Sequence, residues 1–122
     1  MANTYSQIYI HVIFTVQGRQ NLIPEELKEE LHKYITGIIK NKKQKLICIN
    51  SMPDHIHIFI GLEPGIALSD LGRDIKNNSS TFIGEKKGLQ GKFNWQEGFG
   101  AFSYGYSQIA AVVKYIQNQE KH

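Results

Sequence analysis

This chain of 122 residues contains one cysteine, three prolines and one tryptophan. A single cysteine cannot form a disulfide within the chain, which excludes the small secreted folds that depend on disulfide frameworks. Cys48 lies inside an apolar run, and such a lone thiol suits a reducing cytoplasm. The chain also lacks the basic start and apolar segment of a signal peptide. Because no apolar run approaches the ~20 residues needed to cross a bilayer, we expect no membrane span.

The residues that are present fit one globular domain spanning 1–122. The hydrophobic fraction is 41%, with six Phe and six Tyr, so the chain is long and apolar enough to bury a core. The formal net charge is +3 and the sequence pI is about 9.0. This excess of basic residues favours an anionic partner, although the charge alone is a weak indicator.

Seven segments carry a clear periodicity. Alternation with period two predicts strands, and apolar residues at helical spacing predict helices. Two of the three helix starts have the expected local chemistry: Pro24 precedes two glutamates, and Ser107 is a good N-cap. The predicted strands are 6–17, 45–52, 55–60 and 99–106, and the predicted helices are 24–40, 67–84 and 107–121.

The order of these segments is β-α-β-β-α-β-α. The first six match the split β-α-β, ferredoxin-like arrangement of an α+β protein, in which two helices cover one face of an antiparallel sheet. The seventh segment is a C-terminal helix with an apolar stripe. Polar residues at 77–81 weaken the middle of the second helix, which indicates either a ligand-facing surface or an exposed face.

The strand at 55–60 carries the main chemical signal. His55 and His57 alternate with isoleucines, so both imidazoles project from the face opposite the core, with Cα atoms ~6–7 Å apart. Two imidazoles at this spacing can share a metal ion if a third ligand comes from elsewhere. The alternative is a half-polar strand with two exposed histidines. His11, alone on the second face of the first strand, is predicted to be structural or groove-facing rather than a ligand.

Three segments together resemble a known family. They are the His-Val-Ile-Phe-Thr run at 11–15, the Met-Pro-Asp-His-Ile-His-Ile run at 52–58, and the Trp-Gln-Glu-Gly-Phe-Gly-Ala-Phe-Ser run at 95–103 leading to Val-Lys-Tyr-Ile-Gln-Asn-Gln at 113–119. In this order and spacing they resemble the single-tyrosine transposases of the HUH endonuclease superfamily, of the insertion-sequence-200 type and its REP-associated relatives. The resemblance spans nearly the whole chain.

The resemblance implies a role for several residues. Tyr115 corresponds to the nucleophile, His55 and His57 to two ligands of a divalent metal, and Gln119 to the third ligand. The cofactor implied is Mg²⁺ or Mn²⁺, with zinc less expected. Tyr104 and Tyr106 are rival nucleophiles by residue type, but they match no catalytic position and are interpreted as packing or DNA-stacking residues.

The resemblance also implies a reaction and partners. Tyr115 would nick single-stranded DNA, form a 5′-phosphotyrosine and leave a 3′-OH that can reverse the step without ATP, in agreement with the absence of a nucleotide-binding glycine loop. The partners would be hairpin DNA and a second subunit, whose histidines would receive the C-terminal helix in a shared active site.

Basic residues would contact the DNA phosphates, and released counterions would make binding weaken with salt. The candidates are Arg19, Arg73, Lys76 and Lys114. Two other classes stay open: a ferredoxin-like nucleic-acid-binding module without catalytic activity, and a metal-dependent regulatory or structural domain. The first of these would use the aromatic strand as a stacking platform.

Overall fold

The computed structural model describes residues 8–18, 22–63, 65–88 and 93–119. The strands are β1 (Ile8–Thr15), β2 (Lys45–Met52), β3 (His55–Leu62) and β4 (Gly100–Tyr104). The helices are α1 (Lys28–Asn41), α2 (Leu68–Lys86) and α3 (Ile109–Gln117). Short 3-10 turns, η2 (Glu25–Leu27) and η3 (Tyr106–Gln108), precede α1 and α3. The element order predicted from the sequence is confirmed.

The four strands form one antiparallel sheet in the order β2-β3-β1-β4. This is the strand order of a ferredoxin-like split β-α-β fold, and the predicted α+β class is confirmed. β1 lies in the interior of the sheet, as its long apolar pattern predicted. β2 and β3 form the predicted hairpin, with Pro53 and Asp54 in the turn.

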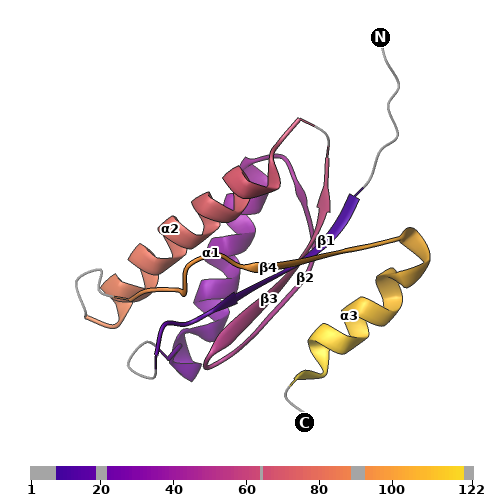
Figure 1. The fold of residues 1–122 in the computed structure, drawn as a ribbon. Helices are drawn as coiled ribbons and strands as arrows, with labels where there is room; N and C mark the ends of the chain where they lie inside the picture. Colours follow the sequence, from indigo (N-terminus) through magenta and orange to yellow (C-terminus); the bar gives the residue numbers. More distant parts are fainter. Residues whose placement is uncertain (1–7, 19–21, 64, 89–92, 120–122) are drawn as a thin grey trace.

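One face of the sheet builds the main core with α1 and α2, which lie together on that side in Figure 1. Alternate residues of the two central strands point into this core, because successive side chains in a strand face opposite sides. They pack against apolar residues of the two helices. The fully buried members include Phe14, Ile56, Ile58, Leu31, Ile35, Leu71 and Ile75.

The segment between α2 and β4 is fixed to both neighbours. Trp95 pairs with Val16 as an extension of β1, and its Nε1 donates a hydrogen bond of 2.9 Å to Ser79 Oγ. Ser79 is buried inside the polar run of α2, and the helix continues through that run without a break. Serine and threonine hydroxyls of this run donate to carbonyls one turn earlier, so much of its polarity is satisfied within the helix.

α3 lies on the opposite face of the sheet (Figure 1). Its buried residues Val112 and Ile116 form a second, smaller cluster with Tyr9, Cys48 and Phe59. The resemblance implies docking of this helix on the histidines of a second subunit, whereas in this single chain it packs on its own sheet. The apolar stripe of α3 finds a matching apolar surface on its own sheet, and covering it removes that surface from water.

The start of α3 also differs from the prediction. The chain turns at Gly105, whose N–H donates to Gln108 Oε1 at 2.8 Å, and Ser107 lies within η3 instead of capping the helix. The regular helix therefore begins at Ile109 and ends at Gln117, and the predicted extension to 121 falls partly outside the described residues.

Candidate active site

His57 lies at the centre of the candidate site, on β3 beneath α3. Only 3% of its surface is exposed. Its Nδ1 is 2.8 Å from Nε2 of His11, and the two rings are stacked with centroids 5.0 Å apart. Nε2 of His57 is buried without a hydrogen-bond partner. Such orphaned polar atoms are rare in folded proteins and call for a ligand, a water or an ion.

Burial holds His57 neutral. Burial, together with smaller contributions from charge on His55 and His11, lowers the pKa of His57 from 6.5 to about 4. The amide of Gln119 opposes this fall in pKa, although it does not complete a hydrogen bond to Nε2. Burial also lowers the pKa of His11. Neutral imidazole is the form that binds metals.

His55 lies two residues earlier, at the start of β3, with 26% of its side chain exposed. Its Nδ1 donates to Oδ1 of Asp54 at 2.6 Å, because a carboxylate can only accept. This contact leaves Nε2 as the nitrogen with a free lone pair. The rings of His55 and His57 meet edge to face at 4.8 Å.

α3 brings the remaining predicted residues to the histidines. The Tyr115 ring lies 6.0 Å from that of His57 and 6.3 Å from that of His11, and 54% of Tyr115 is exposed. Gln119 follows one turn later, and its Nε2 donates to the carbonyl of Tyr115 at 3.0 Å. The amide oxygen of Gln119 is thereby left to accept or to coordinate.

The donor set fits a small divalent metal ion. The rings of His55 and His57 lie 4.8 Å apart, the Gln119 amide acts on His57, and Nε2 of His57 is buried with no hydrogen-bond partner. Imidazole with oxygen ligands suits Mn²⁺ or Mg²⁺ completed by waters. Within the described ranges no three His, Cys, Asp or Glu side chains gather as a metal site. Among the described residues, the Gln119 amide oxygen is the candidate that would complete this one.

The aromatic residues of β4 and η3 differ in their surroundings. Tyr104 contacts Phe59 edge to face, and Tyr106, 80% exposed, meets the edge of Tyr9. Phe102 on β4 is 53% exposed, and its ring is 6.2 Å from His11. Two aromatic rings therefore lie beside the histidines: Phe102 from β4 and Tyr115 from α3.

The predicted DNA-binding residues are spread over the molecule. Lys114 precedes Tyr115 on α3. Arg73 and Lys76 lie on α2, across the sheet from the histidines. Arg73 pairs with Asp70 at 3.1 Å, and Lys76 donates to the carbonyls of Gln96 and Gly98. Arg19 lies outside the described residues. The DNA role of all four stays a prediction.

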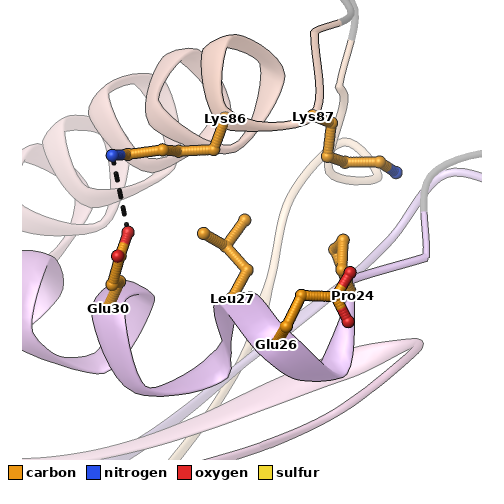
Figure 2. Close-up of a pocket in the computed structure, with 6 residues that line it drawn as sticks. All are labelled: Pro24, Glu26, Leu27, Glu30, Lys86 and Lys87. Carbon is orange, nitrogen blue, oxygen red and sulfur yellow. Dashed lines mark ion pairs between the residues drawn. The ribbon is translucent and has the colours of Figure 1, made fainter.

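A groove of about 490 Å³ lies on the helix side of the molecule, away from the histidines. Figure 2 shows it between the start of α1 and the end of α2, with Glu30 and Lys86 paired at 3.5 Å across it. Lys87, at one end of the groove, donates to the carbonyl of Leu22. One cation of this groove is thus paired with a carboxylate and the other with a backbone carbonyl, and the groove contains none of the predicted site residues.

Sequence reasoning missed three residues that organise the site. His11 was placed apart from the other histidines, Asp54 was interpreted only as a turn residue, and Asn50 was not considered. Asn50 is paired opposite His57 between β2 and β3, and its Nδ2 donates to the carbonyl of Ile116 on α3 at 2.8 Å. The position of His11 on the same sheet face as His57 was readable from strand parity, but the contact needed the register of β1 against β3.

No helix in the described part of the chain is both long and apolar enough to cross a membrane.

Comparison with known proteins gives one family and solved structures of the same fold. Residues 4–119 match the family described as "Transposase IS200 like". The ISDra2 transposase TnpA of Deinococcus radiodurans is 25% identical over 118 residues, covering 93% of this chain and 84% of that protein.

Two solved structures share the fold. A transposase from Deinococcus radiodurans R1 superposes with a TM-score of 0.75 at 19% identity, covering 98% of this chain and 95% of that one. A REP-associated tyrosine transposase bound to a REP hairpin superposes with a TM-score of 0.71 at 17% identity, covering 99% and 72%. At these identities the superpositions describe the fold, which agrees with the strand order found here.

Proposed function

The chain belongs to the family of IS200-like transposases, and we propose that it cuts and rejoins single-stranded DNA through a covalent bond from Tyr115 to a 5′-phosphate. Membership of this family makes the protein a DNA-binding transposase. The strand type, the nucleophile and the metal are the parts that we add.

In the proposed reaction the Tyr115 oxygen forms a bond to the scissile phosphorus, and the bond from phosphorus to the 3′ oxygen breaks. The phenol loses its proton and the leaving 3′ oxygen gains one. One phosphate ester replaces another, so a 3′-OH can reverse the step without a nucleotide cofactor. A free tyrosine has a pKa near ~10 and is a weak nucleophile at neutral pH. Mg²⁺ or Mn²⁺ on His55, His57 and Gln119 would polarise the phosphate.

One observation carries the proposal: Tyr115 lies 6.0 Å, ring to ring, from a histidine whose buried Nε2 has no partner. Tyr115 is half exposed, so a DNA strand can approach its hydroxyl from solvent. Tyr106 is more exposed, but its ring contact is with Tyr9. The location of Tyr115 therefore supports it as the nucleophile over the other tyrosines.

We extend the proposal to the form of the DNA. The related REP-associated transposase is bound to a REP hairpin, and a folded single strand would offer both a duplex stem and reachable unpaired bases. Phe102, exposed beside His11, supplies a flat apolar surface on which an unpaired base can stack. Lys114 supplies positive charge next to the nucleophile. We also propose that the protein works in the cytoplasm, where the free thiol of Cys48 stays reduced.

A homodimer is part of the proposal, although a shared site is not needed to assemble the residues. α3 makes its contacts on its own sheet, and the same contacts would form if two copies exchanged this helix. β4, a short exposed edge strand, offers a surface on which a second copy can pair.

Trapping of a covalent adduct tests the proposal. Labelled single-stranded hairpin DNA with Mn²⁺ is incubated with the protein and resolved on a denaturing gel. Wild type and Tyr106→Phe should give an adduct, and Tyr115→Phe should give none while binding DNA normally, because only a hydroxyl is lost. An adduct in Tyr115→Phe would disprove the assignment of the nucleophile.

The non-catalytic nucleic-acid-binding module is distinguished by the same assay. It predicts a gel shift for every variant, with no adduct on any strand and no dependence on Mn²⁺. The exposed Phe102 and Tyr106 would be common to both functions, so DNA binding by itself does not decide between them.

A further inference from the structure

We infer that His11 is a positioning residue, which holds the His57 ring in the tautomer and orientation that present Nε2 to a metal ion. This inference rests on the proposed metal site. It assigns to His11 a role that differs from that of a ligand and from that of a core residue.

The geometry of the pair is the starting point. His11 lies on β1 and His57 on the neighbouring β3, where Ile13 is paired with His57 and Phe59 with His11. The two histidines are therefore diagonal neighbours on one face of the sheet. Their nitrogens meet at 2.8 Å, a normal hydrogen-bond length, and both side chains are buried.

Only one proton lies between these two nitrogens, so there are two arrangements. If His11 donates from Nε2, His57 accepts at Nδ1 and carries its own proton on Nε2. If His57 donates from Nδ1, its Nε2 keeps a lone pair and His11 carries its proton on Nδ1. A neutral imidazole has one donor and one acceptor, so no third neutral arrangement makes this bond.

The surroundings of Nε2 choose between them. This atom is buried without a hydrogen-bond partner. A proton on Nε2 would be a buried donor without a completed hydrogen bond, and it would block metal binding. A lone pair on Nε2 is satisfied by a metal ion and needs nothing else. Metal-binding histidines regularly donate their other N–H to a neighbouring acceptor, which fixes the tautomer and the ring orientation.

His55 shows the same arrangement with a different partner. Its Nδ1 donates to Asp54, so its Nε2 is also the nitrogen with the free lone pair. The two histidines of the strand are thus held at equivalent atoms, one by a carboxylate in the turn and the other by the ring of His11. Edge-to-face contact of their rings keeps the two planes nearly perpendicular, at 83°.

Two kinds of variant test the role. In His11→Gln the side-chain amide oxygen can reach the place of Nε2 and accept from His57. His11→Phe keeps a ring of similar size and removes the acceptor. Titration calorimetry with MnCl₂ should give roughly 10- to 100-fold weaker binding for His11→Phe. His11→Gln should stay within about threefold of wild type. Thermal melting of both variants reports any loss of folding.

Nitrogen-15 NMR of the metal-free wild type gives an independent readout. Long-range proton–nitrogen correlations at neutral pH identify which nitrogen of each ring carries the proton. We expect the proton of His57 on Nδ1 and that of His11 on its own Nδ1. In His11→Phe the proton of His57 should redistribute between Nδ1 and Nε2, an effect that a loss of packing alone does not produce.

The outcomes separate this inference from the proposed function. If wild type binds Mn²⁺ and His11→Phe binds it equally tightly, His11 does not position His57. A His57 proton on Nε2 in wild type refutes the inference even if the enzyme is active. If wild type binds no Mn²⁺, the metal site of the proposed function is refuted, and the NMR tautomer still decides the role of His11.

Discussion

Asn50 and Ile116 are joined by a hydrogen bond between the sheet and the terminal helix. Asn50 Nδ2 donates to the carbonyl of Ile116 at 2.8 Å, while its Oδ1 accepts the N–H of Ser51 at 3.0 Å. The carbonyls of the last helical turn have no partner within the helix, so this contact satisfies one of them. A contact at Ile116 also restrains rotation of α3 about its axis. Because Tyr115 is the preceding residue, the same contact helps to orient Tyr115.

Replacing Asn50 by leucine should loosen α3 while keeping the branched shape and the number of heavy atoms of the side chain. The carbonyl of Ile116 would lose its side-chain donor, at a cost of about 1–3 kcal/mol in unfolding free energy. We expect a lower melting temperature and a reduced rate of adduct formation, with DNA affinity changed much less. Asn78→Leu, at an exposed position of α2, is the matched control. Unchanged adduct kinetics in Asn50→Leu would show that this contact does not place Tyr115.

Stability should fall in mild acid because of His57. Its pKa in the folded chain, about 4, lies below the ordinary value of 6.5, so the unfolded chain binds more protons between these two values. Above pH 6.5 His57 is neutral in both the folded and the unfolded chain, and its titration costs no stability. As the pH falls toward 4, protonation of His57 in the unfolded chain lowers the free energy of unfolding. The shift corresponds to at most about 3 kcal/mol.

Urea unfolding at several pH values measures this effect. The free energy of unfolding of wild type should decline from pH 7 to pH 4, and His57→Gln should show a shallower decline. His55→Gln, which removes a more exposed histidine from the same strand, should keep most of the wild-type slope. Parallel curves for wild type and His57→Gln would assign the acid sensitivity to other groups.

Removing the Asp54 carboxylate should weaken metal binding at His55. Asp54→Ala leaves Nδ1 of His55 without its acceptor at 2.6 Å, so the ring is free to rotate and change tautomer. Because Asp54 is largely exposed, we expect a loss near the lower end of the ~10- to 100-fold range. Calorimetry with MnCl₂ measures it, with Asp70→Ala on α2 as the control. Equal Mn²⁺ affinity in Asp54→Ala and Asp70→Ala would show that Asp54 does not orient His55 for metal binding.

Gly72 should not tolerate a methyl group. A Cβ at this position of α2 would lie 2.7 Å from Cε2 of Phe99, which precedes β4 and packs edge to face on Phe14. Gly72→Ala should therefore destabilise the fold by about 1–3 kcal/mol. Gly37→Ala on α1 meets open space and should stabilise the protein by up to ~1 kcal/mol. Two thermal melts decide the matter, and a stable Gly72→Ala would mean that Phe99 can move aside.

Complementation tests how α3 docks in solution. In this single chain, Tyr115 lies beside the histidines of the same chain. A mixture of His57→Ala and Tyr115→Phe should therefore stay inactive after subunit exchange. Recovery of adduct formation in the mixture would instead reveal helices exchanged within a dimer, since one composite site would then contain both missing groups.

The fold was predictable because its strands and helices have unambiguous periodicity. Lys45–Met52 was delimited correctly from alternation and the turn at Pro53, and the sheet order follows from the element order of a ferredoxin-like chain. The docking of α3 was not predictable in the same way. The apolar stripe that contains Val112 and Ile116 predicts that one face of the helix is covered. It does not predict which surface covers that face.

The candidate site divides along a similar line. His55, His57, Tyr115 and Gln119 were nominated through a motif resemblance, and the structure brings them together. His11 and Asn50 depend on which residue of one strand stands opposite which residue of the next. That register is a property of the assembled sheet, set by pairing over eight positions between β1 and β3, and no local pattern around either residue encodes it.

The alternation along β3 has a consequence for insertions and deletions. His55, His57 and Phe59 share one face, while Ile56, Ile58 and Ile60 fill the core on the other. Adding or removing one residue within β3, between His55 and Ile60, would turn the side chains on one side of the change through the sheet, placing an imidazole among isoleucines. Length changes of an odd number of residues in this strand therefore damage folding and chemistry together. Homologues should accommodate such changes only in the loops beyond the strand ends.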